Sequence, residues 1–188
     1  MTQTYQNYID GAFVAGGSAT IDVTNPADGA LLARIPDSDA AAVDAAVSAA
    51  RRAQPAWEKR APIERAGYLR QISAKLREHR KELAGVIVRE QGKIQQLAQV
   101  EVDFTADYID YMAEWARRLE GEILTSDRAN ENIFLFRKPI GVVAGILPWN
   151  FPFFLIARKL APAPITGNTI VVKRSQETPN NAYEIGRP

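Results

Sequence analysis

Cysteine is absent from this sequence of 188 residues, and histidine occurs only once. The absence of thiols excludes disulfide frameworks, thiolate zinc sites, covalent haem attachment and a cysteine nucleophile within these residues. An excess of one charge is also missing, because 23 Lys and Arg nearly balance 22 Asp and Glu, for a net charge of +1. A nucleic-acid surface needs a basic footprint. We therefore expect no nucleic-acid partner, and no motif indicates a metal site.

The sequence also lacks a basic leader and an uninterrupted apolar segment of membrane length. Residues 1–7 carry no basic cluster ahead of an apolar run, which argues against a secretory signal. The most apolar stretch, residues 141–157, is interrupted by Pro148, Asn150 and Pro152, which favours a buried strand and helix over a membrane span. We expect a cytoplasmic protein without a membrane partner.

Composition divides the chain into three regions. Residues 1–36 alternate short apolar runs with turn residues, which predicts β-hairpins. Residues 37–124 contain almost no Gly or Pro and carry apolar residues at helical spacing, which predicts amphipathic helices. We expect Asp37 or Ser38 to cap the first of these helices and Pro62 to begin another.

Residues 132–188 contain three strand-like runs and one apolar helix. The helix, residues 151–160, lies between the strands expected at 140–147 and 168–173. A strand, a helix and a strand over so short a span form a βαβ unit, whose two strands are parallel. The sequence therefore predicts an α/β fold in which hairpins and helices precede the sheet.

Ligands of open parallel sheets bind beyond the carboxyl ends of the strands, where Asn150 and Lys173 are expected. The Asn150 amide suits hydrogen-bond donation to an oxyanion, or it caps the following helix. Lys173 suits the hydroxyls of an adenosine ribose, or it is a solvated residue at the end of a strand. The G-x-G-x-x-G turn of ordinary dinucleotide-binding folds is absent, because this turn reads PWNFPF.

Other polar and aromatic residues of the helical region receive no functional role. His79 is interpreted as a surface residue without a carboxylate partner, and Glu90 and Glu101 as helical residues without visible partners. Phe104 belongs to an aromatic stripe, shared with Tyr108 and Trp115, that predicts the core face of a helix following Gly92.

Several motifs of this sequence, in this order, resemble the NAD(P)-dependent aldehyde dehydrogenase superfamily. They are Tyr8-Ile9-Asp10-Gly11, Asn25-Pro26-Ala27, Glu90-Gln91-Gly92-Lys93, Gly145-Ile146-Leu147-Pro148-Trp149-Asn150-Phe151-Pro152 and Gly167-Asn168-Thr169-Ile170-Val171-Val172-Lys173. The resemblance covers essentially the whole chain and implies the amino-terminal part of a Rossmann-like cofactor domain. Residues 94–121 and 151–160 look most like the lactaldehyde and glycolaldehyde dehydrogenases.

The resemblance implies a role for each residue at the strand ends. Asn150 matches the oxyanion-hole asparagine of the family, and Lys173 matches the lysine that binds the adenosine ribose. Three further residues match positions that line the cofactor channel: Ile146, Leu147 and Trp149. The implied activity is oxidation of a small aldehyde to its carboxylic acid, with NAD or NADP as cofactor.

Two departures from the family pattern concern the cofactor. The family usually continues Lys-Pro-Ser-Glu where this chain has Lys173-Arg174-Ser175-Gln176. Gln176 therefore replaces a ribose-binding carboxylate that would repel a 2′-phosphate, and Arg174 adds a positive charge. We expect weakened discrimination against NADP.

Helical spacing suggests a substrate site beside Asn150. Phe154 and Arg158 follow Asn150 at intervals of four residues, which predicts that they share one side of the helix. Arg158 interrupts an apolar helix, either as half of an ion pair with a neighbouring helix or as a tunnel residue that favours small hydroxylated or anionic aldehydes.

The family's glycine-rich turn, catalytic cysteine and general-base glutamate are missing from these 188 residues. We expect this segment alone to be inactive and poorly stable, and the full-length form to be a homo-oligomer. Two alternatives stay open: a truncated remnant with at most weak dinucleotide binding, and a helical interaction module formed by residues 37–124.

Overall fold

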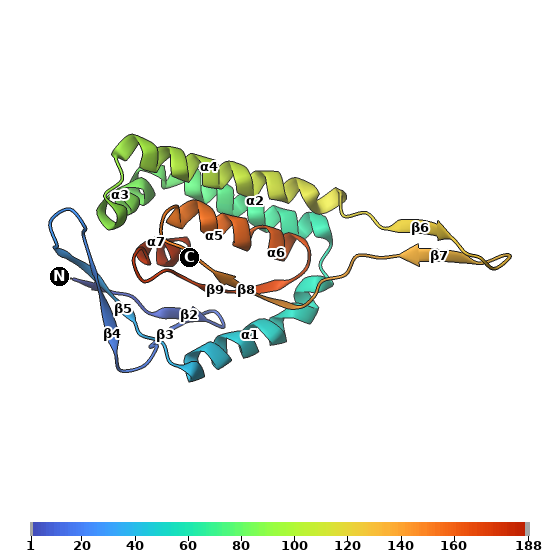
Figure 1. The fold of residues 1–188 in the computed structure, drawn as a ribbon, viewed down its shortest axis with the longest axis horizontal. Helices are drawn as coiled ribbons and strands as arrows, with labels where there is room; N and C mark the ends of the chain where they lie inside the picture. Colours follow the sequence, from blue (N-terminus) through green and yellow to red (C-terminus); the bar gives the residue numbers. More distant parts are fainter. Residues whose placement is uncertain (1, 187–188) are drawn as a thin grey trace.

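The computed structural model describes residues 2–186 and confirms an α/β fold built around a parallel strand pair. Strands β8 (Val142–Ile146) and β9 (Thr169–Lys173) run parallel, and α5 (Pro152–Leu160) with the short α6 (Pro162–Ile165) connects them. Helix α1 (Ala40–Glu58) lies against one side of this pair, and α5 and α6 lie on the other (Figure 1). The predicted βαβ unit is present.

Three further helices cover α5. They are α2 (Pro62–Glu78), α3 (Arg80–Gln91) and α4 (Gln95–Ala113), and Figure 1 shows α2 and α4 side by side above α5. Pro62 begins α2 as expected, and Gly92 ends α3 with a left-handed φ of 68°. The core of this layer runs from Leu69 through Val102 and Ile109 to Phe153.

The buried face of α4 differs from the expected aromatic stripe. Small and β-branched residues face the core: Ala98, Val102, Thr105, Ala106, Ile109 and Ala113. Phe104 is 56% exposed, and Tyr108 and Trp115 are half-buried. Small side chains allow α2 and α4 to approach closely, so the bulky aromatic residues lie at the flank of the contact. The helix also ends earlier than expected, in a 3₁₀ turn η1 (Glu114–Arg117).

The amino-terminal region contains the expected hairpins. Strands β2 (Asn7–Ile9) and β3 (Ala12–Val14) pair antiparallel, as do β4 (Thr20–Thr24) and β5 (Leu31–Pro36). A short strand β1 (Gln3–Thr4), which the sequence did not predict, pairs parallel with β5. The N-cap of α1 is Asp39, whose carboxylate accepts from the Ala42 amide at 2.9 Å, so the assignment to Asp37 or Ser38 was wrong.

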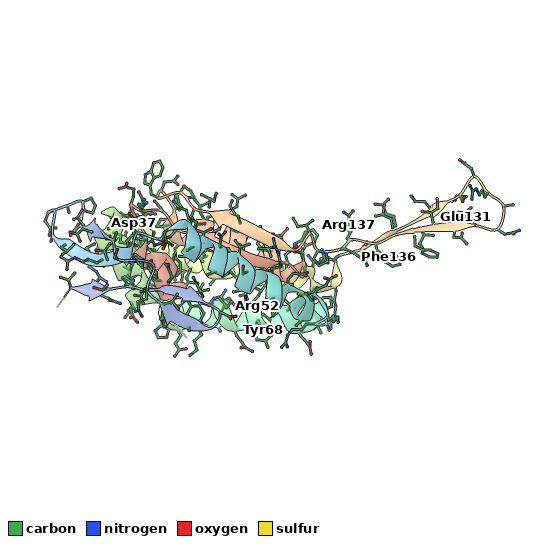
Figure 2. All side chains as sticks on the ribbon, turned by 90° about the horizontal axis from the view of Figure 1, so that it is seen from below. Asp37, Arg52, Tyr68, Glu131, Phe136 and Arg137 are labelled. Carbon is green, nitrogen blue, oxygen red and sulfur yellow. The ribbon has the colours of Figure 1, made fainter. Side chains whose placement is uncertain are left out.

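A third hairpin extends from the body of the molecule. Strands β6 (Glu122–Thr125) and β7 (Asn132–Leu135) form a two-stranded ribbon that stands clear of the helices in both views (Figures 1 and 2). Strand β6 begins inside the stretch expected to be helical. Gly121 precedes it, and a Cβ there would lie 2.2 Å from the Leu135 carbonyl oxygen, so only glycine allows this approach.

The short helix α7 (Asn180–Ile185) packs against α3 and α5 near the end of the described chain. None of the helices within residues 2–186 has the length and apolar character needed to cross a bilayer.

Candidate functional site

The two strand ends that carry Asn150 and Lys173 are neighbours. In the parallel register Ile146 pairs with Lys173, and the Leu147 amide donates to the Lys173 carbonyl oxygen at 3.0 Å. The segments that follow β8 and β9 therefore leave the sheet at the same edge. This is the place where α/β sheets bind ligands.

Most candidate cofactor residues at this edge present their side chains to solvent. Ile146 is 68% exposed and Trp149 is 60% exposed, and Lys173 and Gln176 are exposed as well. Leu147 differs, because only 7% of its surface is exposed and it supports the strand end from within. In residues 2–186 the Lys173 ammonium has no hydrogen bond or ion pair, so its donors are available to a ligand.

Asn150 does not cap the following helix. The N-cap of α5 is Phe151, and the Phe151 side chain cannot accept a hydrogen bond from the amides of the first turn. Asn150 is exposed, and within the described chain its side-chain amide has no hydrogen-bond partner. The capping interpretation is therefore wrong, and the amide is free to donate to a ligand.

The backbone of the Asn150 turn is held by groups that sequence reasoning missed. Gln91 Nε2 donates to the Trp149 carbonyl at 3.0 Å and to the Asn150 carbonyl at 2.6 Å. Thr178 Oγ1 adds a longer contact, 3.4 Å, to the Trp149 carbonyl. Glu101, buried on α4, accepts hydrogen bonds from the start of α5 and pairs with Lys93, so the view that it lacks partners was wrong.

Glu101 accepts hydrogen bonds from the first turn of α5. One of its carboxylate oxygens accepts from the amides of Phe153 at 2.9 Å and Phe154 at 3.3 Å, and the other pairs with Lys93. The Lys93 ammonium also lies 4.1 Å from the centre of the Phe151 ring. A carboxylate in this position satisfies amides that the start of a helix leaves unpaired.

The two substrate candidates on α5, Phe154 and Arg158, differ in burial and in contacts. Phe154 is half-buried and packs against the rings of Phe104 and Tyr108, with centroids at 4.5 Å and 5.7 Å. Arg158 is exposed and forms no ion pair within residues 2–186, so of its two interpretations the ion pair with a neighbouring helix is absent there. Because α5 begins at Pro152, Asn150 lies before the helix and does not share its face with these two residues.

Arg174 is turned to other partners. Its Nε donates to the Tyr183 hydroxyl at 2.8 Å, and an Nη donates to the Pro36 carbonyl at 2.8 Å. The guanidinium also lies over the Tyr183 ring. The Arg174 guanidinium is therefore engaged within the chain, whereas Gln176 is exposed, and weakened discrimination against NADP stays a prediction.

Glu90 is a second buried carboxylate that the sequence did not single out. It accepts from the Asn180 amide at 2.5 Å and from the Asn181 side chain at 2.6 Å, and so caps the start of α7. Burial raises the pKa of Glu90 to about 7, although these hydrogen bonds favour its ionised form. The view that Glu90 lacks partners was wrong.

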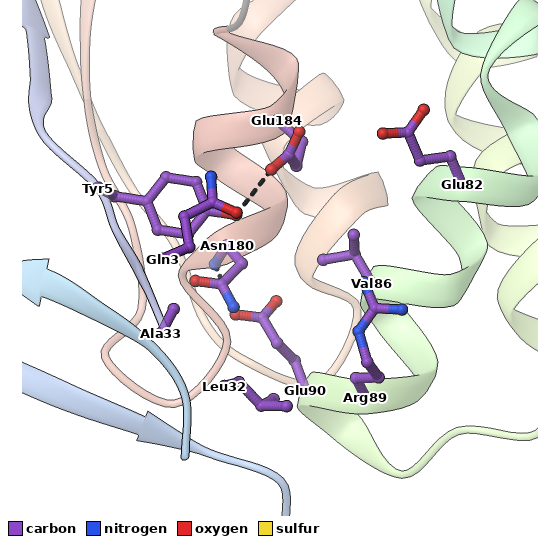
Figure 3. Close-up of a pocket in the computed structure, with 10 residues that line it drawn as sticks. All are labelled: Gln3, Tyr5, Leu32, Ala33, Glu82, Val86, Arg89, Glu90, Asn180 and Glu184. Atoms are coloured by element: carbon purple, nitrogen blue, oxygen red, sulfur yellow. Dashed lines mark hydrogen bonds between the residues drawn. The ribbon is translucent and has the colours of Figure 1, made fainter. Parts of the chain in front are cut away.

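Glu90 lines a cavity of about 170 Å³ between the amino-terminal strands, α3 and α7 (Figure 3). Tyr5 donates to Glu184 at 2.6 Å across this cavity. Neither Asn150 nor Lys173 lines it, so it is separate from the edge of the sheet.

His79, at the junction of α2 and α3, has its Nδ1 3.3 Å from Glu82, so the view that it has no carboxylate partner was wrong. No group of His, Asp or Glu within the described residues is arranged to hold a metal ion.

Comparisons with known proteins agree with this geometry. Lactaldehyde dehydrogenase of Escherichia coli (strain K12) is 62% identical over 189 residues, which cover 96% of this chain and 40% of that protein. A crystal structure of lactaldehyde dehydrogenase from Escherichia coli is 61% identical and superposes with a TM-score of 0.97 over 99% of this chain and 39% of that one.

Two further relatives extend the range of cofactors. The D-glyceraldehyde dehydrogenase (NADP(+)) of Thermoplasma acidophilum is 40% identical, over 96% of this chain and 37% of that protein. The structure of PnpE in complex with nicotinamide adenine dinucleotide is 40% identical, with a TM-score of 0.93 over 97% of this chain and 38% of that one.

This chain therefore spans about 40% of the length of the curated relatives it matches. The profile of the aldehyde dehydrogenase family matches residues 13–187, nearly the whole sequence. Together with the paired strand ends, this match shows that the chain belongs to the aldehyde dehydrogenase family.

Proposed function

We propose that the protein carrying this chain oxidises a small hydroxyaldehyde to its carboxylic acid with NAD or NADP. The observation that carries the proposal is the free Asn150 amide in the turn that follows β8, at the same edge of the sheet as Lys173, the last residue of β9. An unpaired amide donor at the edge of the sheet where a dinucleotide would bind suits a reaction in which an aldehyde oxygen gains negative charge.

Each residue at this edge has a part in the proposed reaction. The Asn150 amide donates to the developing oxyanion, and the Lys173 ammonium donates to the hydroxyls of the adenosine ribose. The exposed Ile146 and Trp149 provide apolar contact for the cofactor beside the buried Leu147. These residues would hold NAD or NADP, which would supply the hydride acceptor for the reaction. The thiolate that attacks the aldehyde in this family comes from outside these 188 residues, because they contain no cysteine.

The test is NAD-linked oxidation by the complete protein, with lactaldehyde and glycolaldehyde compared with a long alkyl aldehyde. Asn150→Ala is expected to lower kcat by roughly 10²–10³-fold, because one oxyanion donor is lost. Gln71→Ala, at an exposed position of α2, is the matched control and should keep wild-type rates. Dinucleotide binding without oxidation of any of these aldehydes would favour the inactive remnant instead.

The preference for a small polar aldehyde rests on Arg158, exposed and without an ion-pair partner within residues 2–186. Arg158→Leu should lower kcat/KM for glycolaldehyde more than for the long alkyl aldehyde. Lys159→Leu, which removes the neighbouring cation of α5, controls for the loss of charge. Equal losses on both aldehydes would contradict a role of Arg158 in substrate selection.

Cofactor choice is tested at Gln176. Gln176→Glu restores a carboxylate at the ribose position, and it should weaken NADP binding much more than NAD binding because a carboxylate repels the 2′-phosphate. Affinities for both cofactors measured on the complete protein decide this, with Glu177→Gln as a control for charge at the adjacent position. A strong wild-type preference for NAD would contradict the proposal that discrimination is weakened.

We also propose that the complete protein is a cytoplasmic homo-oligomer in which the β6–β7 hairpin contacts a second copy. Ile123 pairs with Phe134 on one face of the hairpin, and Leu124 pairs with Ile133 on the other. All four side chains are at least 42% exposed. A ribbon that is apolar on both faces favours burial against another surface.

A further inference from the structure

We propose that Gln91, Lys93 and Glu101 form a clamp that positions the Asn150 amide for oxyanion binding. None of the three touches the reacting atoms, so they are positioning residues that act through Asn150. Gln91 ends α3, Lys93 follows in the connection to α4, and Glu101 lies within α4, all far in sequence from the turn they hold. The proposal rests on the proposed function, which gives Asn150 its role.

The need for such a clamp follows from how Asn150 itself is placed. Its side chain is exposed and has no hydrogen-bond partner within the described residues. It precedes α5, so the regular hydrogen bonds of that helix do not fix it. An oxyanion donor acts only when it stands within tenths of an ångström of its productive place. The position of the amide must therefore come from the backbone that carries it.

Gln91 fixes that backbone from one side. Its single Nε2 group donates to two successive carbonyls, those of Trp149 at 3.0 Å and Asn150 at 2.6 Å. The other end of the same amide, Oε1, is buried without a hydrogen-bond partner. Reversing the amide would place its oxygen against both carbonyl oxygens, so the donor orientation is the favourable one. The two hydrogen bonds from Nε2 therefore come with the cost of leaving the Gln91 Oε1 atom unsatisfied.

Glu101 and Lys93 fix the other side. The Glu101 side chain is fully buried, and its carboxylate accepts from the amides of Phe153 and Phe154 while it pairs with Lys93. The Lys93 ammonium in turn lies over the ring of Phe151, the residue that follows Asn150. Gln91 thus holds the backbone at Trp149 and Asn150, and Lys93 and Glu101 hold the residues that follow, Phe151 and the first turn of α5.

The decisive variants change Gln91 in the complete protein. Gln91→Glu keeps the shape but removes the donor, and Gln91→Met removes it without adding charge. Each is expected to lower kcat/KM for the aldehyde by about tenfold, less than the loss of the Asn150 amide itself. Gln96→Glu and Gln96→Met, at an exposed glutamine in the first turn of α4, are matched controls that should leave activity unchanged.

A double-mutant cycle separates positioning from general damage to the fold. In an Asn150→Ala background there is no amide left to position, so Gln91→Met should cost almost nothing further in kcat/KM. An equal fold-loss in both backgrounds would overturn the proposal, because Gln91 would then act independently of Asn150.

A second measurement does not depend on activity. Amide hydrogen exchange of the complete protein should become faster in the peptide covering residues 148–154 when Gln91 is changed to Met, and stay unchanged in peptides of α2. Unchanged exchange in residues 148–154 would overturn the clamp. If the wild-type protein oxidises no aldehyde, the proposed function fails, and this exchange measurement alone decides whether Gln91 orders the turn.

Discussion

Glu90 and Glu101 show how a single buried carboxylate organises a distant backbone. Each accepts hydrogen bonds from amides at the start of a helix that lies elsewhere in the chain, α7 for Glu90 and α5 for Glu101. The sequence separations are 90 residues between Glu90 and Asn180 and 52 residues between Glu101 and Phe153. No local pattern contains both partners, which is why these carboxylates look unremarkable in the sequence.

The raised pKa of Glu90, about 7, makes stability depend on pH. Between its ordinary value of 4.5 and about 7, the folded protein holds a proton on Glu90 that the unfolded chain has released. The unfolded state then binds fewer protons, so the free energy of unfolding falls as pH rises through this window, by up to about 3 kcal/mol.

Thermal unfolding of the complete protein at several values between pH 4.5 and 7 measures this effect. Glu90→Gln, which cannot ionise, should flatten the pH dependence relative to wild type. Glu177→Gln, at an exposed position, should leave the slope as it is. If Glu90→Gln kept the wild-type slope, another group would be responsible.

At the scale of elements, Arg65 joins the ends of three helices. It is 6% exposed, and its guanidinium donates to the carbonyls of Ile165 at 3.2 Å, Glu58 at 3.1 Å and Arg60 at 2.5 Å. These carbonyls belong to α6, the end of α1 and the connection from α1 to α2. A single side chain therefore fixes how α1 and α2 meet the βαβ unit.

Arg65→Met is expected to destabilise the protein by about 2–4 kcal/mol, because three carbonyls lose a charged donor. Chemical denaturation of the complete protein measures the change. Arg70→Met, at an exposed position of the same helix, should change stability little. A similar loss of stability for both variants would mean that the loss of a positive charge or a change in helix propensity causes it. The contacts of Arg65 with the three carbonyls would then not be the cause.

The elements themselves were largely predictable, and the contacts between them were not. The β8, α5, β9 order and the start of α2 at Pro62 follow from periodicity and turn residues, which are local. Strand β6 was missed because the apolar residues around Ile123 continue the helical pattern of α4. For the site, the residue types at both strand ends were visible, but Gln91 was not, since its partners are 58 and 59 residues away.

At the scale of the whole molecule, the β6–β7 hairpin extends away from the helices and its apolar residues are not covered by the rest of the described chain (Figure 2). Ile123 is 73% exposed, and its partner Phe134 is 58% exposed. Ile123→Lys combined with Phe134→Glu should shift the complete protein toward the monomer, because a charged pair opposes burial of this face.

Light scattering after gel filtration measures the mass of the particle. Gln71→Lys combined with Ala74→Glu places the same charges on exposed positions of α2, outside the hairpin, and is the matched control. It should leave the oligomer intact. A monomeric wild type, or an oligomer unaffected by the Ile123 and Phe134 changes, would contradict the role of the hairpin.

The segment of 188 residues, produced alone, is expected to associate and to bind hydrophobic dyes. Strands β8 and β9 pair only with each other within residues 2–186, so each has an open edge. Ile146 and Trp149, at and just beyond the carboxyl end of β8, and Leu97 and Phe104 on α4 are each more than half exposed. Such apolar surface lowers stability in water and promotes contact between copies.

Gel filtration, dye binding and NAD-linked oxidation should be measured on this segment and on the complete protein at equal concentration. We expect large particles, strong dye fluorescence and no oxidation for the segment, which contains no thiol. A monodisperse segment that unfolds cooperatively and binds little dye would contradict this expectation. It would show that the α2, α4 and α5 core is sufficient for folding even while this much apolar surface stays in water.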